Sequence, residues 1–444
     1  MSLFSMPWGV HPDPKKDPTR QQSIRRTPLP DTVIIPLHQH TGVPCKALVK
    51  PKQEVTRGEL IGDAEALITA PVHSSVAGVV KRIDSRPHQS GSHGQSVIIE
   101  PTEDQPMDLP PSVITLDEVL ALPAAEICKK VRDAGIVGMG GAGFPAHVKL
   151  APPPGKTVEI AILNGAECEP YLTADHRIML ENARDIIDGF RIIMRALGTD
   201  QGIIGIEDNK PDALKAMQNA LKERSGKETI SVRSLHTRYP QGAEKTLIHS
   251  LTKREVPAGG LPADAGVLVS NVATAAAIRN ALLFNFPLVE RVVTVSGGAV
   301  KNPANLLSLV GTPISMLLEE CGWDPNSTAR IVLGGPMMGL ATSSVDVPVT
   351  KTTSGILALT EEEVSRPTPY PCIHCERCAR ACPMNLQPSN LSALCEHGRY
   401  EKAKAHGLLD CFECGTCAYG CPSKIPIVHW LRIGKAALRR TRAA

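Results

Sequence analysis

The sequence predicts a multidomain protein of mixed α/β and α+β class, and three observations support this prediction. First, its 444 residues exceed the roughly 250–300 residues beyond which a single hydrophobic core rarely grows. Second, short Val- and Ile-rich segments near the N-terminus give way to alternating helical and strand-like patterns, which indicates a β domain followed by a layered α/β domain. Third, nine of the 13 cysteines fall in the last quarter of the chain, which predicts a separate C-terminal domain organised by cysteine chemistry.

The first part of the chain is expected to be an arm followed by a small β domain. Residues 1–30 are rich in Pro, Arg, Lys and Asp without periodicity, which indicates an extended arm. Within residues 31–115, the segments 49–62 and 68–83 resemble the two halves of a barrel-sandwich hybrid, the fold of lipoyl and biotinyl carrier domains. Those carriers bear a modified lysine at a hairpin tip, but the matching turn here, residues 73–75, reads His-Ser-Ser. We therefore expect a structural platform without a carrier role.

Residues 116–287 are expected to form a layered, Rossmann-like α/β domain. A helical pattern leads into a glycine-rich stretch at residues 135–150, and the β-branched run at residues 158–171 ends in polar groups. Amphipathic patterns then alternate with short apolar runs, as helices and strands do in such domains. The helical patterns cover residues 172–197 and 211–223, and the strand-like runs cover residues 203–206 and 229–232.

The following segment, residues 288–345, is expected to form a small β-grasp module. The runs VVTVSG (residues 292–297) and RIVLGGPMMG (residues 330–339) are strand-like, whereas LLSLVGTPISMLLEECG (residues 306–322) is expected to be helical throughout. Residues 346–368 contain polar stretches and prolines, which predicts a linker before the cysteine-rich domain.

Eight of the cysteines form the same spacing pattern twice, and this pattern is the most informative feature of the chain. Within residues 369–426, C-x2-C-x2-C-x3-C-P occurs in duplicate, the spacing of a bacterial ferredoxin with two 4Fe–4S clusters. Three closely spaced thiolates cover one face of a cluster, and the fourth ligates the other cluster. The predicted ligand sets are Cys372, Cys375, Cys378 and Cys421 for one cluster and Cys411, Cys414, Cys417 and Cys382 for the second. Electron transfer is therefore the first function that the sequence indicates.

Structural zinc is the main alternative for these cysteines. Zinc also binds four cysteines in C-x2-C pairs, but it needs two pairs per ion and has no use for a third cysteine at the same spacing. A disulfide framework is disfavoured because the remaining cysteines are scattered singly and no secretory leader precedes them. Those five are expected to be small buried side chains: Cys45, Cys128, Cys168, Cys321 and Cys395.

A glycine-rich loop, GMGGAGFP at residues 138–145, is a candidate phosphate-binding site. Glycines let backbone N–H groups approach a phosphate closely, and the N-terminus of a following helix adds positive potential. The loop lacks the G-x-G-x-x-G register of dinucleotide-binding domains. Taken alone, it is therefore equally well explained as a tight turn packed against the sheet.

The loop and three later segments resemble the flavin- and NADH-binding 51 kDa subunit of respiratory complex I. That family has GRGGAGFP with a lysine shortly after, then an Asn-to-Glu-Pro segment, and then a Tyr-x-x-Gly-x-Glu pattern. The matching residues here are Gly140, Gly141, Ala142, Gly143, Phe144 and Lys149, then Asn164, Glu167, Glu169 and Pro170, then Tyr239, Gly242, Glu244 and Leu247, and finally Asn271 and Thr274.

This resemblance implies a pocket for FMN with a site for NADH beside it. Phe144, Glu167 and Glu244 would take part in the reaction at the nicotinamide. The residues that would contact the cofactor are Gly138, Gly140, Gly141, Ala142, Gly143, Lys149, Asn164, Gly242, Asn271 and Thr274.

Three positions depart from the pattern of the complex I protein. Met139 stands where that family has Arg, Ala166 where it has Asp, and Ala243 where it has the first of two paired Glu residues. The loss of these polar groups affects the expected NADH site more than the expected FMN site, since a pocket is defined by its site residues and not by its fold.

The order of the four parts resembles the C subunits of Rnf electron-transport complexes, over residues 28–435. The resemblance implies a subunit that passes electrons between NADH, via FMN, and two 4Fe–4S clusters to membrane partner subunits, especially an iron–sulfur relay subunit. It also implies a peripheral place on the cytoplasmic face of the bacterial inner membrane. A soluble cobalamin reductase of bacterial microcompartments has similar flavin and cluster modules and is the alternative. Those proteins tend to begin at the glycine loop, so residues 31–100 count against it.

Composition excludes two other classes of function. A net charge of +3 and the lack of an aromatic-studded basic stripe argue against nucleic acid as a partner. No apolar run approaches the roughly 18–20 residues that a membrane helix needs, so membrane contact is expected to be peripheral.

The sequence of residues 427–444 predicts a basic amphipathic helix. We expect this helix to cap the cysteine-rich domain, and contact with anionic lipid or a partner subunit is the alternative.

Overall fold

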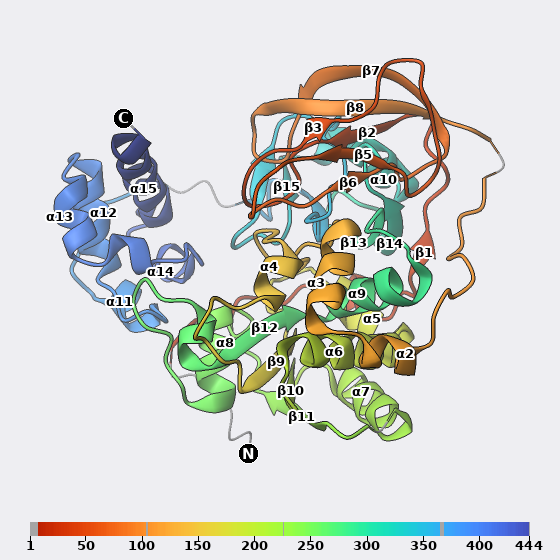
Figure 1. Ribbon diagram of the computed structural model, residues 1–444. Helices are drawn as coiled ribbons and strands as arrows, with labels where there is room; N and C mark the ends of the chain where they lie inside the picture. The colour runs from red at the N-terminus through yellow and green to blue at the C-terminus, as the bar shows by residue number, and fades with distance from the viewer. Residues whose placement is uncertain (1–7, 104, 225, 365–367, 444) are drawn as a thin grey trace.

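The computed structural model describes residues 8–103, 105–224, 226–364 and 368–443. Three β-containing units pack into one body, and a helical C-terminal unit lies beside it (Figure 1). The buried hydrophobic side chains form separate clusters in the N-terminal β unit, the α/β unit, the third unit and the C-terminal unit. The chain is thus multidomain, of α/β and α+β class, as its sequence predicts.

The N-terminal β unit consists of two small sheets that enclose Val33, Ile61 and Ile99. Its turn at residues 73–75 is buried, and the Ser75 hydroxyl donates a hydrogen bond to the Val310 carbonyl (2.6 Å). A turn held in this way cannot present a swinging group, which agrees with a structural platform. One sheet has the order β2 (Val33–Pro36), β8 (His93–Pro101), β7 (Gly78–Pro87) and β4 (Glu54–Val55), and the other has β3 (Lys46–Ala47), β5 (Leu60–Asp63) and β6 (Val72–His73).

The N-terminal arm is more ordered than its sequence suggests. It contains a short helix, α1 (Asp17–Arg20), and a strand, β1 (Arg25–Arg26), which pairs in parallel with an edge strand of the third unit. Lys16 is buried, and its ammonium donates to the carbonyls of Glu167 (2.8 Å) and Leu172 (2.5 Å). The arm therefore ties the α/β unit to the third unit.

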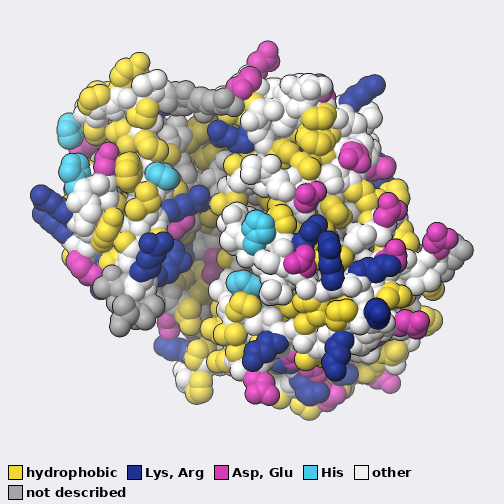
Figure 2. All heavy atoms as spheres, turned by 90° about the horizontal axis from the view of Figure 1, so that it is seen from above, with side chains coloured by type: hydrophobic (Ala, Val, Ile, Leu, Met, Phe, Trp, Pro, Cys, Tyr) yellow, Lys and Arg dark blue, Asp and Glu magenta, His cyan; other side chains and the backbone are white. Residues whose placement is uncertain are grey.

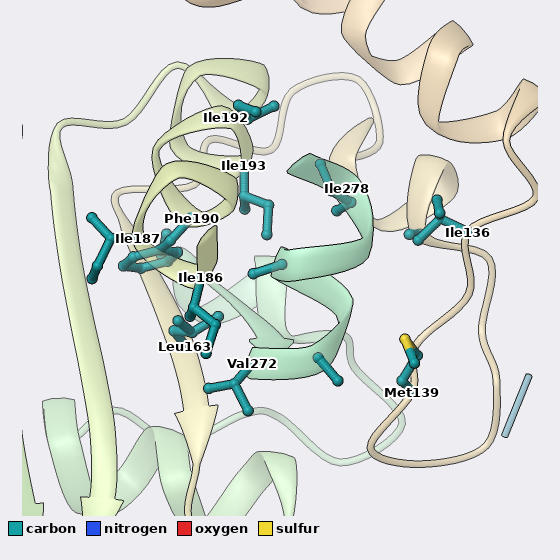
Figure 3. Close-up of a cluster of buried hydrophobic side chains, with 14 of the residues drawn as sticks. Ile136, Met139, Leu163, Ile186, Ile187, Phe190, Ile192, Ile193, Val272 and Ile278 are labelled. Atoms are coloured by element: carbon teal, nitrogen blue, oxygen red, sulfur yellow. The ribbon is translucent and has the colours of Figure 1, made fainter. Parts of the chain in front are cut away.

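The α/β unit is built on a parallel sheet. Parallel sheets are covered on both faces, which explains the nearly continuous apolar runs of their strands. In Figure 3, Ile186, Phe190 and Ile193 of one helix lie near Ile278 of another, above Leu163 of the sheet. The strand order is β11 (Thr229–Leu235), β10 (Gln201–Glu207), β9 (Ile160–Gly165) and β12 (Val267–Asn271), and the helices are α2 (Leu116–Ala121), α3 (Ala124–Asp133), α4 (Ala146–Leu150), α5 (Ala174–Glu181), α6 (Ala183–Leu197), α7 (Pro211–Glu223), α8 (Glu244–Thr252) and α9 (Val272–Phe284).

The third unit differs from the sequence-based expectation in two places. The segment expected to be one helix begins as a strand, β14 (Ala304–Leu309), because its backbone pairs antiparallel with β13 (Glu290–Ser296) and nearly all of its side chains are buried. The helix α10 (Ile314–Glu320) begins only after Gly311, whose φ of +97° interrupts regular structure.

The predicted linker is also partly wrong. Its residues 355–359 form β17 (Gly355–Leu359), a fully buried strand between β13 and β15 (Arg330–Leu333). Polar residues before this strand suggested a loop, but the short apolar run after them completes a sheet. The full order is β1-β14-β13-β17-β15-β16, with β16 at Leu340–Thr342.

The C-terminal unit is helical, and each cysteine run leads into a short helix. The last helix, α15 (Ile427–Ala443), buries Ile427, Leu431 and Leu438 against the unit's core, as expected for a capping helix. None of the described helices combines the length and apolarity needed to cross a bilayer. The other helices are α11 (Arg377–Ala381), α12 (Pro388–Glu396), α13 (Tyr400–Ala405) and α14 (Thr416–Tyr419), with a 3-10 turn, η3, at Leu408–Asp410.

Candidate functional site

The glycine-rich loop between α3 and α4 is fixed on one side by hydrogen bonds to its neighbours, and its other side is exposed. The Gly138 N–H donates to the Phe144 carbonyl (2.9 Å), and the Met139 N–H donates to the Thr274 hydroxyl (3.0 Å). Thr41 of the N-terminal unit donates through its hydroxyl to the carbonyl of Ala142 (2.7 Å). Gly140, Gly141 and Ala142 are exposed. The loop is thus a fixed surface whose outer side is free to receive a ligand.

The surroundings of this loop fit the phosphate end of a flavin nucleotide. A Cβ atom on Gly140 would lie 2.7 Å from the Asn271 amide nitrogen, so only glycine allows this close approach. A Cβ atom on Gly141 would meet nothing within 4 Å, which leaves open space in front of the loop. Asn271 caps α9, a helix of 13 residues, and accepts hydrogen bonds from the N–H groups of Ala273 (2.9 Å) and Thr274 (3.3 Å). Exposed glycines beside a helix N-terminus suit an anion.

An acidic pair lies next to Asn271 at the carboxyl end of the parallel strands. Glu167, at a φ of +46°, accepts hydrogen bonds from the N–H groups of Asp175 (2.7 Å) and His176 (3.2 Å) and so caps α5. The Asn271 amide donates to the Asp175 carboxylate (2.6 Å). Burial, with a contribution from the Glu167 charge, raises the pKa of Asp175 to about 7, although the Asn271 hydrogen bond works in the opposite direction.

Two further contacts bring the remaining predicted residues together. The Lys149 ammonium pairs with the Glu244 carboxylate (2.5 Å) and donates to the Val269 carbonyl (2.9 Å). The Asn164 amide donates to the Gly242 carbonyl (2.8 Å). Parallel strands place their carboxyl ends at one edge of a sheet, where α/β domains bind ligands. The loop, the ends of β9 and β12 and the start of α8 therefore form one region.

The three predicted catalytic residues are not joined to one another. Phe144 is half-buried and contributes its carbonyl to the loop, Glu167 caps α5, and Glu244 pairs with Lys149. Across the described ranges, no hydrogen bond links these three side chains. Their roles at a nicotinamide remain a proposal.

The four cysteines of the second predicted set line one small, partly open cavity. Cys382 from the first motif lies there with Cys411, Cys414 and Cys417 from the second, which is the crossed arrangement of a two-cluster ferredoxin. Burial raises the pKa of Cys411 to about 11, and the neighbouring Cys414 and Cys382 add to that effect. The pKa of Cys417 is also raised, by burial and then by the other three thiols. Four thiols that influence one another around one cavity fit an inorganic cluster.

The cysteine spacing favours a cluster over a single zinc ion, because each run has three cysteines at equal spacing whereas zinc needs two pairs. Among the described residues, no three His, Cys, Asp or Glu side chains are placed to hold one metal ion.

The first predicted cysteine set is more open. Cys378 and Cys421 are buried in the same apolar cluster, Cys375 is half-buried and Cys372 is exposed. The two runs face each other because α11 packs against α14. Geometry thus supports the second set directly and the first set through burial of two of its four members.

Sequence reasoning missed several buried polar residues around these regions. Glu169 accepts hydrogen bonds from the N–H groups of Met337 (3.1 Å) and Met338 (2.9 Å), and burial raises its pKa to about 7. Lys351 is fully buried behind the glycine loop, in the predicted linker. Glu169 lay in a recognised motif, but only the fold places it beside the third unit. Lys351 carries no signal in the sequence.

Family models match most of the chain in the order observed. They are the "RnfC Barrel sandwich hybrid domain" (residues 4–104), the "Nuo51 FMN-binding domain" (131–280), the "SLBB domain" (292–341) and the "4Fe-4S dicluster domain" (371–425). An NAD(+)-reducing nickel–iron hydrogenase, solved in its H2-reduced state, has a similar fold with a TM-score of 0.50. That likeness is at 17% identity and covers 73% of this chain and 65% of that chain.

Two curated relatives match nearly the whole chain. The C subunit of the proton-translocating ferredoxin:NAD(+) oxidoreductase complex of Clostridium ljungdahlii is 46% identical over 98% of this chain and 94% of its own length. The C subunit of the Na(+)-translocating ferredoxin:NAD(+) oxidoreductase complex of Acetobacterium woodii is 43% identical over 96% of this chain and 95% of its own length. With such coverage and the four matched domains, this chain belongs to the family of C subunits of ion-translocating ferredoxin:NAD(+) oxidoreductase complexes.

Proposed function

We propose that this protein is the electron-transfer subunit of an Rnf-type NADH:ferredoxin oxidoreductase, passing electrons between NADH, FMN and two 4Fe–4S clusters. The observation that carries the proposal is the cavity lined by Cys382, Cys411, Cys414 and Cys417, in a chain that also has an FMN-binding domain. A flavin accepts two electrons from a hydride donor and releases them singly, which links NADH to one-electron carriers.

The residues of the α/β unit have separate tasks in this function. The exposed N–H groups of the glycine loop and the N-terminus of α9 bind the FMN phosphate. Glu244 pairs with the Lys149 ammonium and orients it toward the FMN site. Phe144 and Glu167 flank the place of the nicotinamide. In the C-terminal unit, eight cysteine thiolates hold the clusters, and burial limits the access of water to the sulfurs of the buried cysteines.

The partners proposed here are membrane subunits of the same complex, especially an iron–sulfur relay subunit. Ion translocation belongs to those partners. A peripheral position on the cytoplasmic face of the membrane would bring NADH and the relay within reach of one subunit. The N-terminal β unit, matched as the RnfC barrel-sandwich domain, counts against a soluble cobalamin reductase.

Anaerobic purification followed by analysis for iron, acid-labile sulfide and flavin tests the cofactors, and a subsequent NADH titration tests electron entry. The expected result is about eight irons per chain, as two four-iron clusters require, flavin retained, and bleaching of the visible absorbance by NADH. Zinc in place of iron, or flavin and iron without any NADH-dependent bleaching, would refute the proposal.

The variant Gly141→Ala tests the flavin loop. Its Cβ would project into the open space in front of the loop, where a phosphate is expected, so flavin content should fall while thermal stability and iron content stay unchanged. Gly94→Ala is the matched control, because its Cβ also meets nothing within 4 Å but lies in β8 of the other unit. Equal flavin content in the two variants would place the phosphate elsewhere.

A further inference from the structure

The C-terminal unit touches the rest of the molecule at the loop that carries the second cysteine set. Tyr239, only 2% exposed, donates a hydrogen bond from its hydroxyl to the Cys414 carbonyl (2.7 Å). Gly415 follows at a φ of +85°, and a Cβ atom there would lie 3.0 Å from the Met337 carbonyl. On the face seen in Figure 2, a hollow lies between the C-terminal unit and the body. The ligand loop is therefore one point at which the C-terminal unit contacts the body.

Glu169 ties this contact to the flavin region. Its carboxylate binds the N–H groups of Met337 and Met338 and lies within hydrogen-bond reach of the Tyr239 hydroxyl. A Cβ atom on Gly335 would be 2.2 Å from that carboxylate, so the fit admits only glycine. Glu169 stands two residues after Glu167, which accepts from the Asp175 N–H, and the Asp175 carboxylate in turn accepts from Asn271 beside the glycine loop. One short segment thus reaches from the flavin region to the Cys414 loop.

The N-terminal arm reaches the same side of the C-terminal unit. The Gly9 N–H donates to the carbonyl of Ala381 (3.1 Å), the residue before Cys382, and Val10 exchanges two backbone hydrogen bonds with Tyr239 (2.9 and 3.0 Å). Cys382 belongs to the second set, whose ligands line the cavity. Both contact points on the C-terminal unit therefore adjoin that set.

The first set is the more exposed of the two. Cys372 is exposed, and the flanking Tyr370 and Ile373 are each 66% exposed. Tyr419, on the helix before Cys421, is also exposed. Because one of its ligands, Cys372, is itself exposed, the first set can be approached by another protein.

We propose that Cys382, Cys411, Cys414 and Cys417 hold the inner cluster, which exchanges electrons with the flavin site, and that the other set holds the outer cluster, which exchanges them with a partner subunit. Tyr239 and Glu169 are positioning residues for the inner set. Each exchange moves a single electron, and no bond forms or breaks. This order rests on the proposed function, since it presupposes that NADH supplies the electrons through FMN.

Two ligand variants test the order. In Cys375→Ser, low-temperature EPR should still show reduction of the remaining cluster by NADH, because the inner set is intact. In Cys417→Ser, dithionite should reduce the remaining cluster but NADH should not, because the step from the flavin site is lost. Dithionite reduction in each variant shows that the remaining cluster is assembled.

The outcomes separate the order from the proposed function. Wild-type protein in which dithionite reduces both clusters and NADH reduces neither would overturn the proposed function and the order with it. NADH reduction that survives Cys417→Ser but is abolished by Cys375→Ser would overturn the order alone.

Tyr239→Phe gives a test that does not depend on ligand variants. Loss of the hydroxyl should accelerate amide hydrogen exchange in residues 411–417, leave residues 372–378 unchanged, and slow NADH reduction of the inner cluster several-fold at full iron content. Tyr171→Phe is the matched control, because it removes a hydroxyl that is bonded to Glu363 (2.9 Å) and not to a cysteine loop. Exchange in residues 411–417 that is the same in both variants would contradict a positioning role for Tyr239.

Discussion

At the scale of single residues, the buried Lys351 links the N-terminal β unit to the flavin loop. Its ammonium donates to the carbonyls of Pro71 (2.6 Å) and Gly135 (2.7 Å), and Gly135 lies three residues before the loop begins. Burial lowers the pKa of Lys351 from 10.5 to about 7. The neighbouring His40 and His73 are affected in the same way, with pKa values lowered to about 4 and about 3 by burial. Burial between the N-terminal β unit and the glycine loop therefore favours the neutral forms of these three side chains.

This pKa shift predicts a pH dependence of stability. Between about pH 7 and 10.5 the unfolded chain carries the Lys351 proton and the folded chain has largely lost it. Because the unfolded state binds more protons, stability should rise with pH across that window. The melting temperature of wild-type protein should therefore increase more from pH 7 to pH 9 than that of Lys351→Met.

The control for this measurement is Lys301→Met, which replaces an exposed lysine. It should keep the wild-type increase. Lys351→Met should also melt lower at both pH values, because the Pro71 and Gly135 carbonyls lose their donor. A wild-type pH profile in Lys351→Met would show that Lys351 does not titrate in this window.

At the scale of elements, the α/β unit depends on one close crossing of helices. Gly189 of α6 packs against the backbone of α9, and a Cβ atom there would lie 1.9 Å from the Ala275 carbonyl. The N-terminus of α9 carries Asn271, so the position of α6 sets where the proposed flavin-binding end of α9 lies. A glycine in mid-helix is otherwise unfavourable, which indicates that close packing is its purpose here.

The variant Gly189→Ala sets packing against helix propensity. Propensity alone would stabilise the helix by about 1 kcal/mol, whereas a Cβ forced into the α9 backbone should cost about 1–3 kcal/mol or more. We expect a lower melting temperature of the α/β unit and weaker flavin retention. Gln218→Ala, at an exposed position of α7, changes propensity without packing and should be nearly neutral. A more stable Gly189→Ala protein would mean that α6 and α9 can move apart freely.

At the scale of the whole molecule, the N-terminal arm connects three units. It adds β1 to the sheet of the third unit, places Lys16 in the α/β unit and reaches the cluster unit through Gly9. The described contacts of the cluster unit with the body include the Cys414 loop and Ala381, so the arm restricts how that unit can turn. In the proposed order of electron transfer, this restraint keeps the flavin site and the inner cluster at a fixed separation.

Deletion of residues 1–12 tests this restraint. It removes the contacts of Gly9 and Val10 but keeps Lys16, so flavin and iron content should be unchanged. Stopped-flow bleaching by NADH should be slower, because the cluster unit samples more orientations. Deletion of residues 1–7 is the control that leaves the Gly9 and Val10 contacts in place. Equal rates for the two deletions would show that those contacts do not restrain the unit.

The sequence by itself determined those features that depend on local spacing. The crossed ligand sets follow from loop reach and stay a prediction, and the structure places Cys382 around one cavity with Cys411, Cys414 and Cys417. The helix at residues 211–223 follows from its apolar period and has the bounds of α7. Gly140 and Asn271 were grouped through the resemblance to the complex I subunit, and the structure brings them together because a loop and a strand end meet at one edge of a parallel sheet.

Only the tertiary structure decided features that depend on partners distant in sequence. Ala304–Leu309 and Gly355–Leu359 are strands because β13 offers them an edge on each side, a condition that no local pattern reports. The burial of Lys16 and Lys351, and the contact of Tyr239 with Cys414, arise where separate units meet. A charge or a hydroxyl in such a place is stabilised by carbonyls far along the chain, so the sequence shows the group while the fold alone supplies its environment.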